Sequence, residues 1–171
     1  MRKQIGVLGG SKENLPADTR KAQQMLQAAE EVGRLLAQAD CIVFTGGMDG
    51  IMEAVSKGAK LAGGMTVGTP GKDRGACNPF VDVEVCTPIN TGDFIFAGIL
   101  SCDALIVFPG GAGTWAELCI AYRYRKPMII FQGFDERLDA LVGRSLDISA
   151  KMVFQGSSNP AECVSVLLQQ L

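Results

Sequence analysis

Short apolar runs closed by glycines alternate along this chain with longer segments of helical periodicity. Such runs lie at residues 5–8, 41–44 and 104–108, and each leads into a turn with two or more glycines. A strand that is apolar at every position is buried on both faces, which is typical of a parallel sheet covered by helices. The pattern therefore predicts an α/β fold with a doubly wound, Rossmann-like parallel sheet and helices on both faces.

The rest of the chain continues this alternation. Residues 18–39 repeat apolar side chains three and four positions apart, which predicts a long helix. Residues 81–85 alternate valine with acidic residues, which predicts a strand near an edge of the sheet with one solvated face. Further strands are expected at 65–68, 128–131 and 151–155, and further helices at 50–62, 93–101, 115–123, 136–142 and from 160 onward. No linker or repeat divides the sequence, so we expect residues 1–171 to form a single domain that binds a nucleotide or phosphate.

Composition argues against several classes of function. The formal net charge is −2 and the basic residues are scattered, so a nucleic-acid partner is not expected. No apolar run approaches the roughly 20 residues of a membrane span, and no signal peptide opens the chain, so we expect a cytoplasmic protein without a membrane partner. The six cysteines lack CxxC spacing and histidine is absent, which indicates reduced thiols and no metal site.

Three glycine-rich turns end three of the expected strands. Glycine leaves no Cβ between the backbone and a ligand, and the helix start behind each turn offers N–H groups to an anion. Ligands of such sheets bind beyond the carboxyl ends of the strands, so the turns predict a pocket for a phosphorylated small molecule. The alternative is that the glycines only close tight turns. The expected binding residues are Gly9, Gly10, Ser11, Gly46, Gly47, Gly50, Pro109, Gly110, Gly111, Gly113, Thr114 and, one turn into its helix, Glu117.

Two of these turns resemble the motifs of a known family. Residues 109–117 read PGGAGTWAE, which resembles the PGGxGTxxE signature of the Lonely Guy phosphoribohydrolases, proteins often mislabelled lysine decarboxylases. Residues 46–54 read GGMDGIMEA and resemble the companion motif GGxxGxMxA. The same Rossmann-like superfamily contains molybdenum-cofactor carrier proteins. The short chain and the segment Asn90-Thr91-Gly92 are more similar to that carrier-type branch.

The resemblance implies two functions. A carrier would hold a nucleotide or a phosphorylated cofactor, such as the molybdenum cofactor, without turnover, although the sequence itself requires no cofactor. A hydrolase would release free base and ribose 5-phosphate from a nucleoside 5′-monophosphate, with Glu117 as its acid/base or ribose-binding carboxylate. The hydrolases carry an arginine on the helix before the PGG strand, whereas residues 91–101 contain neither arginine nor lysine, which favours the carrier. The resemblance also implies a homodimer or homotetramer.

A few other residues are candidates for the pocket. Lys12, Lys72 and Arg74 belong to expected loops and are either ligand contacts or solvated surface residues. Asp93 is either a polar pocket group or a helix cap. Trp115 is a candidate for stacking on a base, with packing in a core or an interface as the commoner use of tryptophan.

Overall fold

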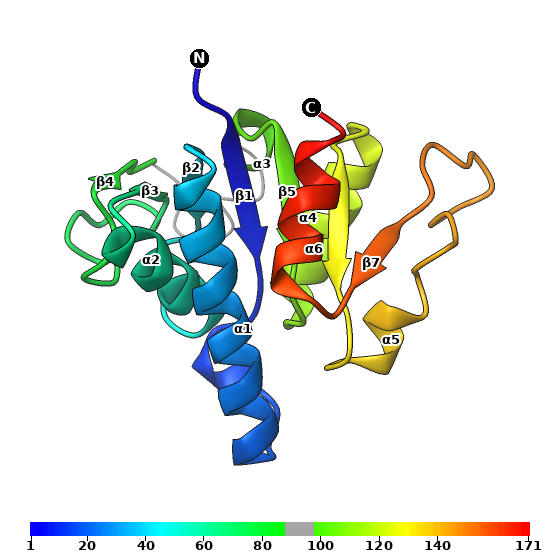
Figure 1. Ribbon diagram of the computed structural model, residues 1–171, viewed down its shortest axis with the longest axis horizontal. Coiled ribbons are helices and arrows are strands. Elements are labelled where there is room, and N and C mark those ends of the chain that lie inside the picture. Colours follow the sequence, from blue (N-terminus) through cyan, green and yellow to red (C-terminus); the bar gives the residue numbers. More distant parts are fainter. Residues whose placement is uncertain (88–97) are drawn as a thin grey trace.

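Seven parallel strands form one sheet in the computed structural model, which describes residues 1–87 and 98–171. The strands are β1 (Gln4–Leu8), β2 (Ile42–Thr45), β3 (Met65–Gly68), β4 (Val83–Glu84), β5 (Ala104–Val107), β6 (Met128–Phe131) and β7 (Gln155–Ser157). Their order is β4-β3-β2-β1-β5-β6-β7, with β1 in the centre (Figure 1). The chain builds outward from β1 on one side and from β5 on the other, so this pair is the switch point of the sheet.

Helices cover both faces of the sheet. One face carries α1 (Thr19–Gln38), α2 (Ile51–Leu61) and α6 (Pro160–Leu168), and the other carries α3 (Ile99–Ser101), α4 (Ala112–Arg123) and α5 (Glu136–Asp139). A short 3₁₀ helix, η1 (Lys12–Asn14), lies between β1 and α1. Figure 1 shows α1 and α6 in front of the sheet and α4 behind it. Within the described ranges, no helix is both long and apolar enough to cross a membrane.

Strands β5 and β6 are apolar at every position because their side chains enter two separate cores. Ala104 and Ile106 of β5 pack on the side of α1, α2 and α6, whereas Leu105 and Val107 pack on the side of α4. Successive residues of a strand point to opposite faces, so a strand buried on both faces needs an apolar side chain at every position. All four residues of β5 are fully buried.

Helices α1 and α2 cross at two glycines. A Cβ on Gly33 would overlap the carbonyl group of Val55, and a Cβ on Gly58 would overlap that of Glu30. Without these Cβ atoms the two helix backbones come into direct contact. The ion pair between Lys57 Nζ and Glu30 Oε2, at 2.9 Å, lies beside the crossing. The crossing fixes α2, and with it the turn where α2 begins, relative to the rest of the domain.

The fold class expected from the sequence is confirmed, but two strand predictions are not. The strand expected at 151–155 is wrong in its bounds, because residues 129–131 of β6 pair with Gln155–Ser157. The strand expected at 81–85 is reduced to Val83–Glu84, and both Val83 and Val85 are exposed, so the expected buried face is absent. Its position at an edge of the sheet is confirmed.

Three helix predictions also differ from the structure. Helix α4 begins at Ala112 rather than 115, because the end of the glycine-rich turn already forms its first turn. Helix α5 ends at Asp139 rather than 142. Of the helix expected at 93–101, the described residues form only α3, Ile99–Ser101. Asp93 and the segment Asn90-Thr91-Gly92 lie outside the described residues.

Candidate functional site

The glycine turns after β1 and β5 contact each other at the switch point of the sheet. The backbone N–H of Gly10 donates to the carbonyl oxygen of Pro109 at 2.9 Å. A Cβ on Gly110 would lie 2.8 Å from the backbone nitrogen of Gly10, which is closer than real Cβ atoms approach. Gly110 must therefore be a glycine for the two turns to keep this contact.

The turn after β2 is hydrogen-bonded to the segment that follows β1. The backbone N–H of Ile51 donates to the carbonyl oxygen of Gly10 at 3.0 Å. The backbone N–H of Lys12 donates to Asp49 Oδ1 at 2.9 Å. Gly50 has a φ of 69°, and a Cβ there would overlap the carbonyl group of Gly10. All three glycine turns thus meet beyond the carboxyl ends of β1, β2 and β5.

The helices that begin at these turns start differently from α1, α5 and α6. Helices α1, α5 and α6 each begin at a residue whose side chain accepts hydrogen bonds from the first backbone N–H groups: Asp18, Asp135 and Asn159. Helix α4 begins after Gly111 and α2 after Gly50, and neither glycine can cap its helix in this way. The first N–H groups of a helix have no partner within it and carry the positive end of its dipole. The start of α4 therefore presents donors suited to an anion.

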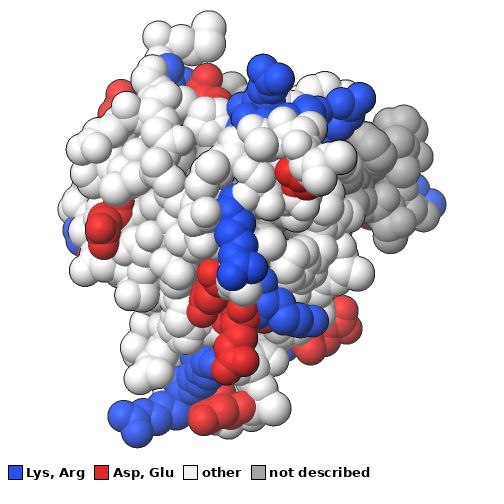
Figure 2. Space-filling view, turned by 90° about the vertical axis from the view of Figure 1, so that its right-hand side faces the viewer, with Lys and Arg blue, Asp and Glu red and all other residues white. Residues whose placement is uncertain are grey.

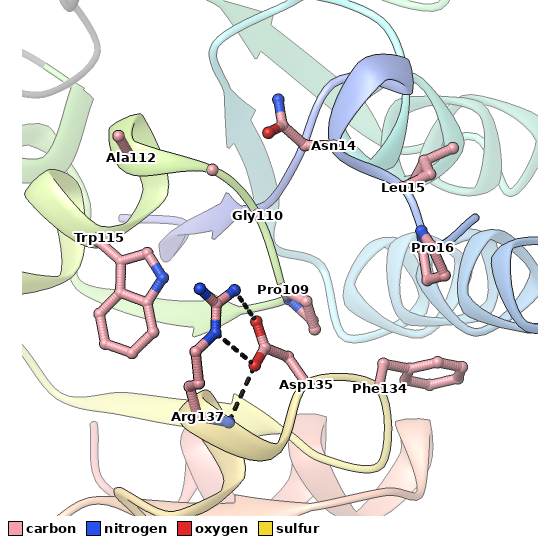
Figure 3. A pocket seen from close by; sticks show the side chains of 11 residues that line it. Asn14, Leu15, Pro16, Pro109, Gly110, Ala112, Trp115, Phe134, Asp135 and Arg137 are labelled. Carbon is pink, nitrogen blue, oxygen red and sulfur yellow. Dashed lines mark hydrogen bonds and ion pairs between the residues drawn. The ribbon is translucent and has the colours of Figure 1, made fainter. Parts of the chain in front are cut away.

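A groove of about 810 Å³ opens beside residues 109–111 (Figure 3). Its walls come from residues 14–16, from residues 109–112 with Trp115 of α4, and from the segment that leads into α5. The lining residues are Asn14, Leu15, Pro16, Pro109, Gly110, Gly111, Ala112, Trp115, Phe134, Asp135 and Arg137. This volume lies within the range of small-molecule sites, about 300–1,000 Å³. The groove is large enough for a nucleotide and adjoins the start of α4.

Arg137 and Asp135 form an ion pair in this groove. Arg137 Nε donates to Asp135 Oδ1 at 3.1 Å, and Nη2 donates to Oδ2 at 2.7 Å (Figure 3). Oδ1 also accepts from the backbone N–H of Arg137 at 2.9 Å. The hydrogen bond from the Arg137 side chain lowers the pKa of Asp135. The carboxylate therefore holds the guanidinium in one orientation, and Nη1 bonds to no described residue.

Elsewhere on the surface, opposite charges lie close together. Figure 2 shows one face of the molecule, on which basic and acidic side chains are interspersed between large uncharged areas. Ion pairs such as Arg2–Asp40, with 2.8 Å between Arg2 Nε and Asp40 Oδ1, neutralise charge locally. Exposed charges further apart than about 10 Å are screened by salt, so the electrostatic potential in the groove is set by the groups that line it. These groups are the start of α4 and the Arg137–Asp135 pair.

The candidate cations expected from the sequence do not line the groove. Lys12 Nζ lies 3.3 Å from Glu53 Oε2, on the side of the turn after β2. Lys72 and Arg74 are exposed on the loop after β3. Backbone hydrogen bonds and, more weakly, the charge of Arg74 lower the pKa of Glu84 on β4. Lys72 and Arg74 thus belong to the β3–β4 side of the molecule.

Gly46 and Gly47 also lie on that side, beneath the loop after β3. The backbone N–H of Asn78 donates to the carbonyl oxygen of Gly47 at 2.7 Å, and Asn78 Nδ2 donates to that of Met48 at 2.9 Å. Gly47 has a φ of 78°, in the left-handed region that favours glycine. Gly47 thus contacts this loop and Gly46 lies against Met52 of α2, whereas Gly9 and Gly10 adjoin the turn at Gly110 and the start of α2.

Glu117 and Trp115 lie on different flanks of α4. Two residues along a helix correspond to a rotation of about 200°, so Trp115 faces the groove and Glu117 faces away from it. Glu117 is half-buried, and desolvation raises the pKa of its carboxyl to about 8. Between these flanks Thr114 is buried directly beneath Gly110, and Gly113 is exposed.

Several groove residues were not anticipated from the sequence. Asn14 donates from Nδ2 to Ser11 Oγ at 3.1 Å and covers Gly111, where a Cβ would meet Asn14 Oδ1. Asp135 and Arg137 follow β6, the strand that pairs with β5. Their position directly after β6 could have identified them, because residues that follow neighbouring parallel strands lie at the same ligand-binding edge of the sheet.

Comparison with known proteins identifies the family. A sequence model of the SLOG cluster4 family matches residues 2–164. The chain belongs to the SLOG cluster4 family. This family member is 32% identical over 136 residues to an uncharacterised protein of Archaeoglobus fulgidus, a match that covers 76% of this chain and 84% of that protein.

Solved structures share the whole fold of this SLOG cluster4 protein. The molybdenum cofactor binding protein of Rippkaea orientalis has a TM-score of 0.84 at 27% identity, over 99% of this chain and 98% of that one. The molybdenum cofactor carrier protein of Chlamydomonas reinhardtii has a TM-score of 0.80 at 27% identity, over the same shares of the two chains. The resemblance to the superfamily that contains these carriers is confirmed.

Proposed function

We propose that this SLOG cluster4 protein binds a phosphorylated, nucleotide-like molecule and holds it without turnover, as a carrier or binding protein. The phosphate binds at the start of α4, and the rest of the ligand lies in the adjoining groove. The observation that carries this proposal is the contact of Gly10 with Pro109 and Gly110 at the switch point. It places an uncapped helix start at the mouth of a groove of about 810 Å³.

The molybdenum cofactor is the proposed cargo, on the basis of the relatives from Rippkaea orientalis and Chlamydomonas reinhardtii. The start of α4 suits the phosphate of such a molecule, because the backbone N–H groups there are free of a side-chain cap. Among the described residues, no group of three or more acidic or cysteine side chains is placed to ligate a metal ion. The protein would therefore hold the cargo by its phosphate and its ring.

Calorimetric titration with ribose 5-phosphate and with a nucleoside 5′-monophosphate tests the phosphate site. The informative variant is Gly111→Asp, because the new carboxylate caps α4 itself and competes with the ligand. We expect saturable binding by the wild type and binding at least tenfold weaker in Gly111→Asp, with urea unfolding to check that the variant still folds after Asn14 Oδ1 gives way to the new Cβ. Ala161→Asp, which adds the same charge on the exposed surface of α6, is the control and should bind normally. Equal affinity of Gly111→Asp and wild type would refute the phosphate site.

Hydrolysis of nucleoside 5′-monophosphates is the second candidate, and the pKa of Glu117 favours it. A carboxyl group with a pKa of about 8 is protonated at neutral pH and is able to act as a general acid on a leaving base that binds on the Glu117 flank of α4, opposite the groove. The assay incubates the protein with several nucleoside 5′-monophosphates and quantifies free base and ribose 5-phosphate. Base release that is lost in Glu117→Gln would establish the hydrolase. Saturable binding without release would leave the carrier.

A further inference from the structure

The groove also indicates which kind of ring the ligand carries. We propose that Arg137 selects a planar ring with two neighbouring hydrogen-bond acceptors on one edge, as in guanine and pterins, over an adenine ring. This inference rests on the proposed function, because the ring enters the groove only if the phosphate binds at the start of α4.

The Arg137–Asp135 pair presents donors to the groove. The side of the guanidinium formed by Nε and Nη2 is bonded to the Asp135 carboxylate. Both carboxylate oxygens accept from Arg137, and Oδ1 also accepts from its backbone N–H. The donors that Asp135 does not use lie at the end of the guanidinium. They are two parallel N–H groups, one on Nη1 and one on Nη2. A ligand edge that faces this end must therefore supply acceptors.

Guanine and adenine differ at this edge. Guanine presents O6 and N7, two acceptors that match the two parallel N–H groups of an arginine. An oxidised pterin presents a carbonyl oxygen and a ring nitrogen in the same way, whereas in a reduced pterin that nitrogen carries a hydrogen and only the carbonyl oxygen accepts. Adenine presents N7 beside an amino group, and that amino group would face an arginine donor. Arg137 thus favours the oxo-substituted ring and disfavours the amino-substituted one.

The other walls of the groove suit a planar ring. Trp115 is half-buried and lines the groove from α4, and Figure 3 shows its indole on the same side of the groove as the Arg137 guanidinium. Leu15, Pro16 and Phe134 supply further apolar surface. Aromatic side chains bind the faces of bases by stacking, without regard to base identity. Trp115 therefore contributes affinity for any ring, and Arg137 contributes the choice between rings.

The ion pair is suited to this role because it does little for the fold. The Arg137 side chain is 74% exposed, whereas that of Asp135 is 15% exposed. Exposed ion pairs add little to stability, and Asp135 still accepts the backbone N–H that starts α5 when the arginine side chain is removed. Arg137→Ala is therefore expected to fold normally, so a change in its ligand preference reports on binding.

The test measures dissociation constants for GMP, AMP and ribose 5-phosphate by calorimetry. We expect the wild type to bind GMP at least tenfold more tightly than AMP, since one bidentate arginine contact gives discrimination of about this size. Arg137→Ala should reduce the ratio to less than about twofold, and the loss of one positive charge from the groove should weaken the binding of AMP and of ribose 5-phosphate by a similar, smaller factor. Arg137→Lys should lose the preference too, because the ammonium group of lysine lacks the two parallel N–H groups of a guanidinium. Arg20→Ala removes an exposed arginine of α1 and should keep the wild-type preference.

The outcomes separate this inference from the phosphate site. Equal affinity of the wild type for GMP and AMP, or a preference that survives in Arg137→Ala, would overturn the role of Arg137 and leave the phosphate site standing. Absence of binding by ribose 5-phosphate and by both nucleotides would overturn both proposals. Trp115 is the single tryptophan of the chain, so its fluorescence locates the ring. Quenching by GMP but not by ribose 5-phosphate is expected, and unchanged emission with bound GMP would refute the groove as the ring site.

Discussion

Gly58 of α2 packs against the carbonyl group of Glu30 on α1 so closely that a Cβ on Gly58 would overlap it. Gly33 makes the reciprocal contact with Val55, so each helix contributes one glycine to the crossing. Because α2 begins at Gly50, next to Gly10, this crossing fixes the position of the turns that form the candidate site. A change at the crossing acts on both stability and site geometry.

Replacing Gly58 by alanine should destabilise the domain. The new methyl group forces the two helix backbones apart, at a cost of about 1–3 kcal/mol. The overlap is with a backbone carbonyl group, which cannot rotate away, so the cost lies at the upper end of this range. Alanine recovers up to about 1 kcal/mol through its higher helix propensity, which leaves a net loss of about 1–2 kcal/mol. Urea unfolding followed by circular dichroism measures the change. Gly113→Ala is the matched control, because a Cβ at this helical glycine meets nothing within 4 Å, and it should be neutral or slightly stabilising. Equal stability of Gly58→Ala and wild type would contradict the close crossing.

Gly110→Ala should abolish phosphate binding even if the domain still folds. The Cβ would overlap Thr114 Oγ1 and lie 2.8 Å from the backbone nitrogen of Gly10, so the turn must move away from its neighbour. We expect a loss of about 1–3 kcal/mol of stability and at least a tenfold loss of affinity for ribose 5-phosphate. Calorimetry and urea unfolding measure the two effects. Unchanged affinity would mean that the contact between the turns has no part in binding.

Glu117 should make the stability of the protein fall as the pH rises. Burial raises the pKa of its carboxyl from 4.5 to about 8 in the folded state. Between these values Glu117 binds more proton in the folded state than in the unfolded state, so its contribution to stability is fully present below pH 4.5 and is lost as the pH rises to 8. Thermal unfolding of Glu117→Gln should show a flatter dependence between pH 5 and pH 8, with the variant more stable than wild type at pH 8. A wild type and a variant with parallel pH profiles would show that Glu117 is ionised in the folded protein at neutral pH.

Two of the six cysteines should react quickly with thiol reagents. Cys86 and Cys119 are exposed, whereas burial raises the pKa of Cys102 to about 12 and that of Cys163 to about 11. The thiolate is the reactive form, so buried thiols of high pKa react slowly. Brief labelling at pH 8 followed by peptide mass spectrometry should find label on Cys86 and Cys119, with the other four labelled only in urea. Fast labelling of Cys102 would contradict the core packing around α3.

The sequence predicts the central elements well because burial on both faces leaves a local signature. Strand β5 is apolar at every position, and its bounds are found to within one residue. Strand β7, with the sequence Gln-Gly-Ser, has no such signature. It is a strand because its backbone pairs with β6, and pairing between distant segments is not visible in local composition.

The sequence indicates those parts of the candidate site that depend on local backbone conformation. It does not indicate those that depend on which distant segments the fold brings together. The glycines after β1, β2 and β5 stand out in the sequence as clusters, and Gly50 and Gly110 among them leave no room for a Cβ beside the backbone of the neighbouring turn. Arg137 does not stand out, because an arginine two residues after an aspartate is common on any surface. Its place in the groove follows only from the pairing of β6 with β5, which brings the start of α5 beside the start of α4.

Two of the bonds that join the three turns run between backbone atoms, from Gly10 to Pro109 and from Ile51 to Gly10, and a third runs from the backbone N–H of Lys12 to Asp49 Oδ1. Side chains of the groove, such as Trp115 and Arg137, take no part in these bonds. Anchoring and selection are therefore carried by separate chemical groups. A related protein is free to exchange the selecting side chains and accept a different cargo, while the anchor made of main-chain atoms stays as it is.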